Sequence, residues 1–289
     1  KIKTTYFTLK FSTHRKYITN KEQLKTGEAF DLCLDSKREL LITCPQPSIE
    51  SLERYYDSEE YISHNDEAKG LMAFLYKAVK KYSLSNKVKL VNSLSADKST
   101  LLDIGAGTGE FCKSIFENGW NVQGVEPSTK ARELAKTKGL DLKESIDDYT
   151  GNKFTVITLW HVLEHLPDLQ KTLLKIEALL EKDGVLIIAV PNYKSYDAHY
   201  YKEFWAAFDV PRHLWHFSRE SMNVIFSNDL RLTKTKPLLF DSFYVSLLSE
   251  KYKSNASFSL KALLVGLWSN LKALRTKEHS SLIYCYRKF

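Results

Sequence analysis

The chain has 289 residues, of which 43% are hydrophobic and 27% charged, a balance typical of a soluble globular protein with one large domain and appendages. Its formal net charge of +7 comes from basic residues near the two ends, which we interpret as a solvated surface rather than a nucleic-acid-binding face. No apolar run reaches the ~18 residues of a membrane-spanning helix, no signal peptide opens the chain, and the four cysteines form no CxxC pair. We therefore expect a reduced, cytoplasmic protein without membrane association, although a targeting segment ahead of Lys1 is left open.

The N-terminal third predicts two small units ahead of the main domain. Residues 1–47 predict a small β segment, with one strand of a hairpin at residues 38–43. Cys33 and Cys44, with His14 as the nearby histidine, offer too few ligands for tetrahedral zinc, so we expect no metal site. The prolines at 45 and 47 then break the chain, and residues 48–95 predict a helical cap.

Three glycines at alternate positions follow a buried strand in the stretch LLDIGAGTGEF, residues 101–111. A strand, a tight turn and a helix in this order bring bare backbone and a helix N-terminus against a ligand. A dinucleotide fingerprint requires glycines at relative positions one, three and six. Here Gly109 stands at position five and Glu110 at position six, which favours a neutral or cationic nucleoside over a dinucleotide.

The acid Glu126 ends the next predicted strand, residues 121–126. An acid at the tip of the second strand is placed to accept hydrogen bonds from ribose hydroxyls. Strands and helices continue to alternate through residues 140–191, which predicts an α/β fold with a doubly wound, mostly parallel sheet and right-handed crossovers. Ligands of such sheets bind at the carboxyl ends of the strands.

Two motifs carry a family resemblance. DIGAGTGEF, residues 103–111, resembles motif I of the class I S-adenosylmethionine (SAM) dependent methyltransferases. WHVLEHLPD, residues 160–168, is similar to the segment after the fourth strand in methyltransferases of small molecules such as quinone precursors. The resemblance extends from about Cys44 to the C-terminus. It implies a Rossmann-like, seven-stranded sheet with an antiparallel last strand, within a SAM-binding domain at 96–289 that carries an insertion at about 243–278.

The resemblance also implies SAM as the methyl donor, with S-adenosylhomocysteine as product, and a set of residues that bind it. Glu126 would bind the ribose, Ile146 and Asp147 would flank the adenine, and Trp160 and His161 would line the methionine side, with Glu164 nearby. Tyr61 and His64 of the cap either close over the methionine end or only pack the cap onto the domain. The full cofactor-binding set is Asp103, Gly105, Ala106, Gly107, Glu126, Pro127, Ile146, Asp147, Trp160, His161, Tyr61 and His64.

The loop 193–217 is unusually long for a connection after a strand and is rich in aromatic residues, histidines and an arginine. The family resemblance persists there in DVPRHLWHFS. Methyl transfer to a hydroxyl benefits from a base that removes the proton, and we nominate His213 or His216, with Arg212 orienting an anionic acceptor and His165 as a further candidate. The alternative is that Arg212 and His213 bind backbone carbonyls and hold the loop as a lid.

We expect the protein to transfer the methyl group of SAM to a small-molecule acceptor at an oxygen, with nitrogen and carbon left open. Two alternatives are methylation of RNA or protein, although no RNA-binding module is recognised, and a catalytically silent SAM-binding protein. The apolar helix expected at 258–274 packs on the core by default; covering the acceptor pocket, a homodimer contact and a membrane surface are other options.

Overall fold

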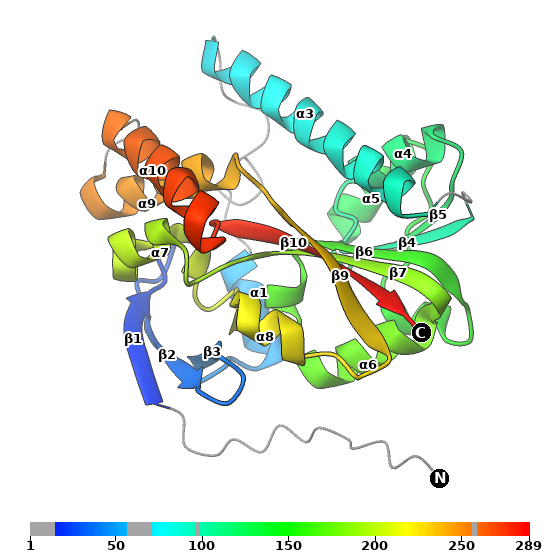
Figure 1. Cartoon of the computed structure of the whole chain (residues 1–289), viewed down its shortest axis with the longest axis horizontal. Coiled ribbons are helices and arrows are strands. Elements are labelled where there is room, and N and C mark those ends of the chain that lie inside the picture. The colour runs from blue at the N-terminus through cyan, green and yellow to red at the C-terminus, as the bar shows by residue number, and fades with distance from the viewer. Residues whose placement is uncertain (1–14, 57–70, 96–98, 256–258) are drawn as a thin grey trace.

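The computed structural model describes residues 15–56, 71–95, 99–255 and 259–289. Its centre is a six-stranded sheet in the order β5-β4-β6-β7-β10-β9 (Figure 1). The first four strands are parallel, and β10 runs antiparallel to both β7 and β9. This confirms the predicted α/β class and the antiparallel last strand. The strands are β4 (Thr100–Ile104), β5 (Asn121–Val125), β6 (Phe154–Trp160), β7 (Leu180–Pro191), β9 (Leu230–Pro237) and β10 (Ser281–Lys288).

The sheet has six strands among the described residues rather than the seven predicted. The segment expected as a third strand, residues 140–145, makes only a single bridge from Lys143 to Val125. Pairing stops there because Ser145 caps the 3-10 helix η1 (Ile146–Tyr149), accepting a hydrogen bond from the backbone of Asp147. The side chains of this segment still help to close one end of the core, since Leu142 is buried.

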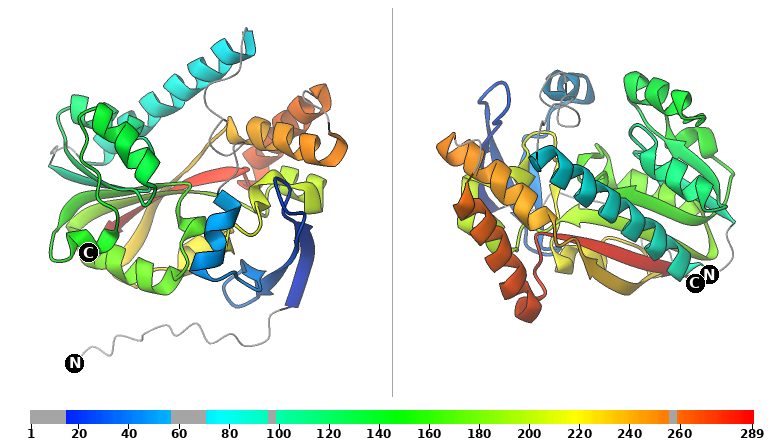
Figure 2. Two further views of the ribbon diagram at one scale, coloured as in Figure 1. Left: turned by 180° about the vertical axis from the view of Figure 1, so that it is seen from behind. Right: turned by 90° about the horizontal axis from the view of Figure 1, so that it is seen from above.

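Helices cover both faces of the sheet (Figures 1 and 2). One face packs against apolar residues of α3 and α4, and the other against α6 and α8. The central strands β4, β6 and β7 are largely buried and apolar, as expected inside a parallel sheet, whereas the edge strand β9 is mostly polar and exposed. The helices are α3 (Leu71–Leu94), α4 (Glu110–Glu117), α5 (Thr129–Thr137), α6 (Leu169–Leu179) and α8 (Arg219–Val224).

A second, antiparallel sheet joins the N-terminal segment to the long loop after β7. Its order is β1 (Arg15–Lys21), β2 (Ala29–Asp35), β3 (Leu40–Cys44) and β8 (Trp215–His216). The last pairing sets Leu41 opposite His216 and Ile42 opposite Trp215. In the chain, the short helix α1 (Ile49–Tyr56) follows β3, and the short helix α7 (Tyr196–Tyr201) lies between β7 and β8. The N-terminal strands therefore help to position the loop that the sequence marks as functional.

Helices α9 (Asp241–Ser254) and α10 (Leu260–Thr276) form a hairpin at one end of the molecule (Figure 1). The small side chains of α10 face inward, while its large apolar side chains are exposed. The helix packs against the rest of the molecule, as expected by default, through its buried side, where Val265 joins an apolar cluster with residues of α7 and α9; the large apolar side chains lie on the other side. No helix in the described part of the chain is both long enough and apolar enough to span a bilayer.

Candidate functional site

The glycine turn, residues 105–109, adopts a backbone that residues with side chains rarely take. Gly105, Gly107 and Gly109 have φ angles of 73°, 55° and 76°, in the left-handed region that favours glycine. A Cβ on Gly105 would lie 2.4 Å from Cγ2 of Val162, whereas a Cβ on Gly107 would have nothing within 4 Å. Gly105 thus allows the end of β6 to pack against the turn, and Gly107 leaves bare backbone beside open space.

The carboxylate of Glu126 is fixed beside this turn. Its Oε2 accepts a hydrogen bond from the N–H of Gly107 and its Oε1 accepts one from the N–H of Ser128, both at 2.8 Å. Each carboxylate oxygen has a further lone pair, and the side chain is half-buried. Glu126 therefore stands at the carboxyl end of β5 with carboxylate lone pairs free to accept further hydrogen bonds. Its neighbour Pro127 is exposed. On the turn itself, the N–H of Ala106 donates a hydrogen bond to the carbonyl of Val125 in β5.

Asp103 lies under the turn rather than over it. The Thr158 hydroxyl donates to its Oδ1 at 2.6 Å, and Cys112 Sγ lies 3.6 Å from its Oδ2. Burial raises the pKa of Asp103 to about 6, although the Thr158 hydrogen bond and the charge of Lys87 oppose the shift. The carboxylate of Asp103 therefore ties β4 to β6, and its contact with the cofactor stays a prediction.

The predicted adenine residues stand on η1. Ile146 is partly buried against the core, and the exposed Asp147 forms an ion pair with Lys175 of α6. Both follow the segment that bridges β5 through Lys143. The structure thus sets them next to the strand that ends in Glu126, and their adenine role stays a prediction.

Trp160 and His161 end β6 as predicted, and each is held by a charged residue. Lys87 Nζ lies 4.5 Å from the ring centroid of Trp160. His161 has a φ of 58°, and its Nε2 lies 3.2 Å from Asp241 Oδ2 while its Nδ1 lies 3.4 Å from Glu164 Oε1. Burial would lower the pKa of His161, but these two carboxylates outweigh it and raise the pKa to about 10. His161 is therefore a cation that links the start of α9 to the end of β6.

Glu164, His165 and His213 come together beyond the end of β6. The first two belong to the 3-10 helix η2 (Leu163–His165), and His213 belongs to the long loop after β7. The N–H of Leu214 donates to the backbone carbonyl of Glu164 at 2.8 Å, which holds the two segments together. One ligand atom from each of the three side chains lies within 4.8 Å of the others, so they could hold a metal ion. The sequence indicated His165 and His213 as separate candidates and did not indicate that the two side chains lie together.

The tautomer of each histidine follows from its partners. His165 Nδ1 lies 3.1 Å from the carbonyl oxygen of Arg212 and also 3.1 Å from the Tyr56 hydroxyl, which can accept as well. His213 Nδ1 lies 2.9 Å from the carbonyl oxygen of Ala207. A carbonyl oxygen only accepts, so Nδ1 carries the proton and Nε2 holds the lone pair in each neutral ring. Burial and the nearby His213 lower the pKa of His165 to about 4. The His165 imidazole thus presents an unprotonated nitrogen.

Arg212 does not have the role predicted for it. Its side chain is 1% exposed, and its guanidinium donates to both oxygens of Asp209, to Glu22 Oε1 at 3.2 Å and to the Tyr55 carbonyl at 2.9 Å. A guanidinium whose donors are used in this way has no free edge for an anionic acceptor. We therefore assign Arg212 to holding the loop against the N-terminal sheet, which is the alternative raised from the sequence.

His216 is also structural. The Thr43 hydroxyl donates its one proton to the carbonyl of His213 at 2.7 Å, so it must accept from His216 Nε2, which lies 3.0 Å away. Complete burial and the neighbouring His213 hold the pKa of His216 well below its usual value. We therefore assign His216 to the β3–β8 pairing in place of the predicted base.

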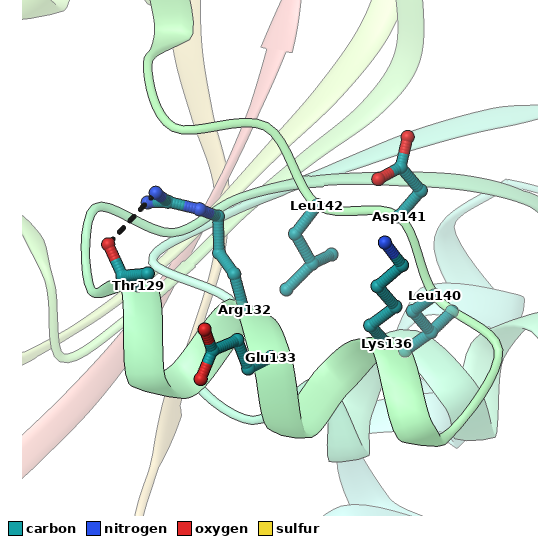
Figure 3. Close-up of a pocket in the computed structure, with 7 residues that line it drawn as sticks. All are labelled: Thr129, Arg132, Glu133, Lys136, Leu140, Asp141 and Leu142. Atoms are coloured by element: carbon teal, nitrogen blue, oxygen red, sulfur yellow. Dashed lines mark hydrogen bonds between the residues drawn. The ribbon is translucent and has the colours of Figure 1, made fainter.

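Two other predicted residues and one surface pocket lie apart from this site. Tyr61 and His64 fall outside the described residues. Figure 3 shows a pocket between α5 and the segment that follows it. It contains none of the residues singled out from the sequence and does not lie over the glycine turn, so we do not take it as the functional site. Its lining residues are Thr129, Arg132, Glu133, Lys136, Leu140, Asp141 and Leu142.

A family model described as a methyltransferase domain matches residues 76–229, more than half of the chain. The chain belongs to the SAM-dependent methyltransferases. The match spans the glycine turn, Glu126 and the Glu164–His165–His213 cluster. SAM, the predicted cosubstrate, is thereby confirmed. The residues present fit it, since Gly107 leaves open space at the turn and Glu126 keeps free lone pairs beside it.

Curated relatives of this methyltransferase match only part of its length. A ubiquinone biosynthesis O-methyltransferase of Actinobacillus pleuropneumoniae serotype 7 is 34% identical over 106 residues, which cover 32% of this chain and 45% of the relative. An uncharacterized methyltransferase of Anoxybacillus flavithermus is 32% identical over 98 residues, with 32% and 46% covered. The chain thus spans less than half the length of these relatives.

Solved structures share the methyltransferase fold at low identity. Magnesium protoporphyrin IX methyltransferase from Synechocystis PCC 6803 with bound SAH has a TM-score of 0.53 at 15% identity, covering 83% of this chain and all of the other. A possible histamine N-methyltransferase from Thermotoga maritima has a TM-score of 0.50 at 18% identity, covering 74% and 93%. At these identities the likeness establishes the fold alone.

Proposed function

We propose that this methyltransferase transfers the methyl group of SAM to a hydroxyl oxygen of a small-molecule acceptor. The observation that carries the proposal is the junction at Gly105. The absent Cβ lets Val162 pack against the glycine turn, and Glu164 follows Val162 by two residues. The donor-binding turn and the polar cluster are therefore parts of one local structure.

SAM supplies a methyl group made electrophilic by its sulfonium. Transfer breaks the methyl–sulfur bond, forms a methyl–oxygen bond and releases the proton of the acceptor hydroxyl. We propose that the cluster accepts this proton, with Nε2 of His213 as the general base. The ubiquinone biosynthesis O-methyltransferases among the relatives support an oxygen acceptor. The buried setting of Glu164 and His213 also limits access of water to the reacting groups.

The test is a transfer assay on the full chain with tritiated SAM and a panel of catechols, phenols and aliphatic alcohols, with each product identified by NMR. His213→Ala should keep its SAM affinity and lose turnover by about 10²–10⁴-fold, the usual contribution of acid–base catalysis. His199→Ala is the matched control, because the His199 ring bonds to Ser195 within its own helix region. Methylation only at nitrogen or carbon would overturn the oxygen assignment, and full activity of His213→Ala would remove His213 from the reaction.

A further inference from the structure

We infer that Glu164, His165 and His213 form a binding site for a divalent transition-metal cation of the Zn²⁺ type. The first observation is the state of Glu164. Its side chain is 1% exposed, yet among the described residues neither carboxylate oxygen accepts a hydrogen bond. The charged His161 forms an ion pair with Oε1, its Nδ1 lying 3.4 Å away outside hydrogen-bond geometry. A buried carboxylate normally has several donors or a metal, and one ion pair leaves Glu164 short of partners that a metal cation would supply.

The two histidines are oriented in the way metal ligands usually are. Each gives its Nδ1 proton to a backbone carbonyl, of Arg212 or of Ala207, and keeps a lone pair on Nε2. In metal sites the second imidazole nitrogen is almost always fixed by such a carbonyl or carboxylate, which sets the tautomer and the ring orientation. This pattern occurs twice at the same place, on segments more than 40 residues apart in the chain.

The donor set and its spacing indicate the class of cation. Two imidazoles and one carboxylate suit Zn²⁺ and related first-row ions better than Mg²⁺, which prefers oxygen ligands. The ligand atoms lie within 4.8 Å of one another, and tetrahedral zinc brings its ligands to ~3.4 Å, so modest side-chain rotation closes the site. Asp209 is held by Arg212 and does not enter the set. Three protein ligands leave a coordination position open for water or an acceptor oxygen.

This inference rests on the proposed function only for the role of the ion in methyl transfer. With a cation at this place, Nε2 of His213 would be a metal ligand and no longer the general base, and an acceptor hydroxyl on the open position would lose its proton to water more readily. Cation binding itself needs neither SAM nor an acceptor. It can therefore be measured separately from methyl transfer.

The experiment is calorimetric titration of the chelator-treated full chain with ZnCl₂, with Co²⁺ as a spectroscopic probe and MgCl₂ as a comparison. Wild type should bind one Zn²⁺ and give a visible cobalt absorption band, and Mg²⁺ should bind far more weakly. Glu164→Gln and His213→Ala should each weaken Zn²⁺ binding by at least about 10–100-fold, while His199→Ala should not. SAM affinity, measured on the same samples, shows that the variants are folded.

The outcomes separate this inference from the proposed function. Absence of Zn²⁺ binding by wild type, or binding that survives both Glu164→Gln and His213→Ala, would overturn the metal site even if methyl transfer proceeds. Zn²⁺ binding without any methyl transfer would leave the metal site standing and count against the proposed function alone.

A second, independent inference concerns the exposed face of α10, which we propose docks on an anionic membrane surface. Six large apolar residues recur at helical spacing on one side, each 46–70% exposed: Leu260, Leu264, Leu267, Trp268, Leu271 and Leu274. The opposite side is buried and carries small residues. A Cβ on Gly266 would lie 2.9 Å from the Phe243 Cα, so α10 packs closely on α9 and leaves its large side chains outward.

The positive charge of α10 favours an anionic membrane as the surface that this face binds. Lys261, Lys272 and Arg275 lie on this helix, Lys277 follows it, and it contains no acidic residue. Helices with a leucine- and tryptophan-rich face flanked by lysine and arginine lie in the interface of anionic bilayers. A second copy of this chain would bring the same positive charges against these, which argues for lipid rather than self-association.

The test is co-flotation of the full chain with vesicles of phosphatidylcholine alone and of phosphatidylcholine with phosphatidylglycerol. Wild type should bind the anionic vesicles, and Leu264→Asp/Leu271→Asp should bind at least tenfold less. Leu134→Asp, a change at a similarly exposed leucine on α5, is the matched control and should bind as wild type does. Failure of wild type to bind anionic vesicles would overturn the proposal. So would a dimer, seen by light scattering, that dissociates in the double variant while no vesicle binding is observed.

Discussion

Glu126 holds the glycine turn through the Gly107 N–H, and we propose that the same carboxylate binds the ribose, so its replacement would act on the donor site directly. We predict that Glu126→Ala weakens SAM binding by about 2–4 kcal/mol, because paired hydrogen bonds to a charged group are lost. Calorimetric titration with SAM measures this change, and Glu133→Ala, on the exposed side of α5, is the control. Unchanged SAM affinity in Glu126→Ala would refute the ribose assignment.

Asp103 makes the stability of the fold depend on pH. Because burial raises its folded-state pKa to about 6 from an ordinary value near 3.8, it favours the folded state below about pH 4, and this contribution is lost as the pH rises through 6. Relative to wild type, Asp103→Asn should therefore gain about 2 kcal/mol in unfolding free energy between pH 4 and pH 7. Urea unfolding at both pH values measures the difference. A pH profile unchanged by the substitution, as expected for exposed Asp141→Asn, would show that Asp103 is not the titrating group.

The turn between β4 and α4 and the end of β6 act as one element, which Gly105 makes possible. Gly105→Ala meets both a positive φ of 73° and a Cβ contact of 2.4 Å with Val162, so we expect it to destabilise the protein by about 2–4 kcal/mol. Gly139→Ala has a similar φ, 82°, with nothing within 4 Å, and should cost only about 1 kcal/mol. Thermal unfolding ranks the two variants, and SAM binding should fall for Gly105→Ala alone. Equal effects would mean that the Val162 contact does not matter.

An ion pair between two residues far apart in the sequence holds the N-terminal sheet against the loop after β7. Glu22, which follows β1, reaches Arg212, and both are 1% exposed. Glu22→Ala leaves the buried guanidinium with one fewer carboxylate and frees the backbone N–H groups of the turn after β1. We predict a loss of about 3 kcal/mol or more in unfolding free energy, measured in urea. The exposed pair of Glu28 with Arg54 provides the control, since Glu28→Ala should change stability by less than about 1 kcal/mol. A comparable loss in both variants would contradict a special role for the buried pair.

The sequence predicts those parts of the molecule that depend on residues close together in the chain. The glycine turn, the acid after β5 and the apolar strands each depend on a few neighbouring residues, and the structure has them where the pattern indicates. The roles of Arg212 and His216 depend on Glu22 and Thr43, which stand far away in the chain and carry no local signal. Asp241 was missed for the same reason, since only the fold brings the start of α9 to His161. The outward direction of the large apolar side chains of α10 could not be predicted, because an apolar stripe does not say which side of a helix is covered.

The central claim is that SAM binds at the carboxyl ends of β4, β5 and β6 with its reacting end toward Glu164, His165 and His213. A crystal structure of the full chain with S-adenosylhomocysteine tests it most directly. We predict that the ribose hydroxyls lie within hydrogen-bond distance of Glu126 and that the sulfur lies on the side of Trp160 and His161 that leads to this cluster. A ligand bound elsewhere, or one whose sulfur points away from the cluster, would contradict the account.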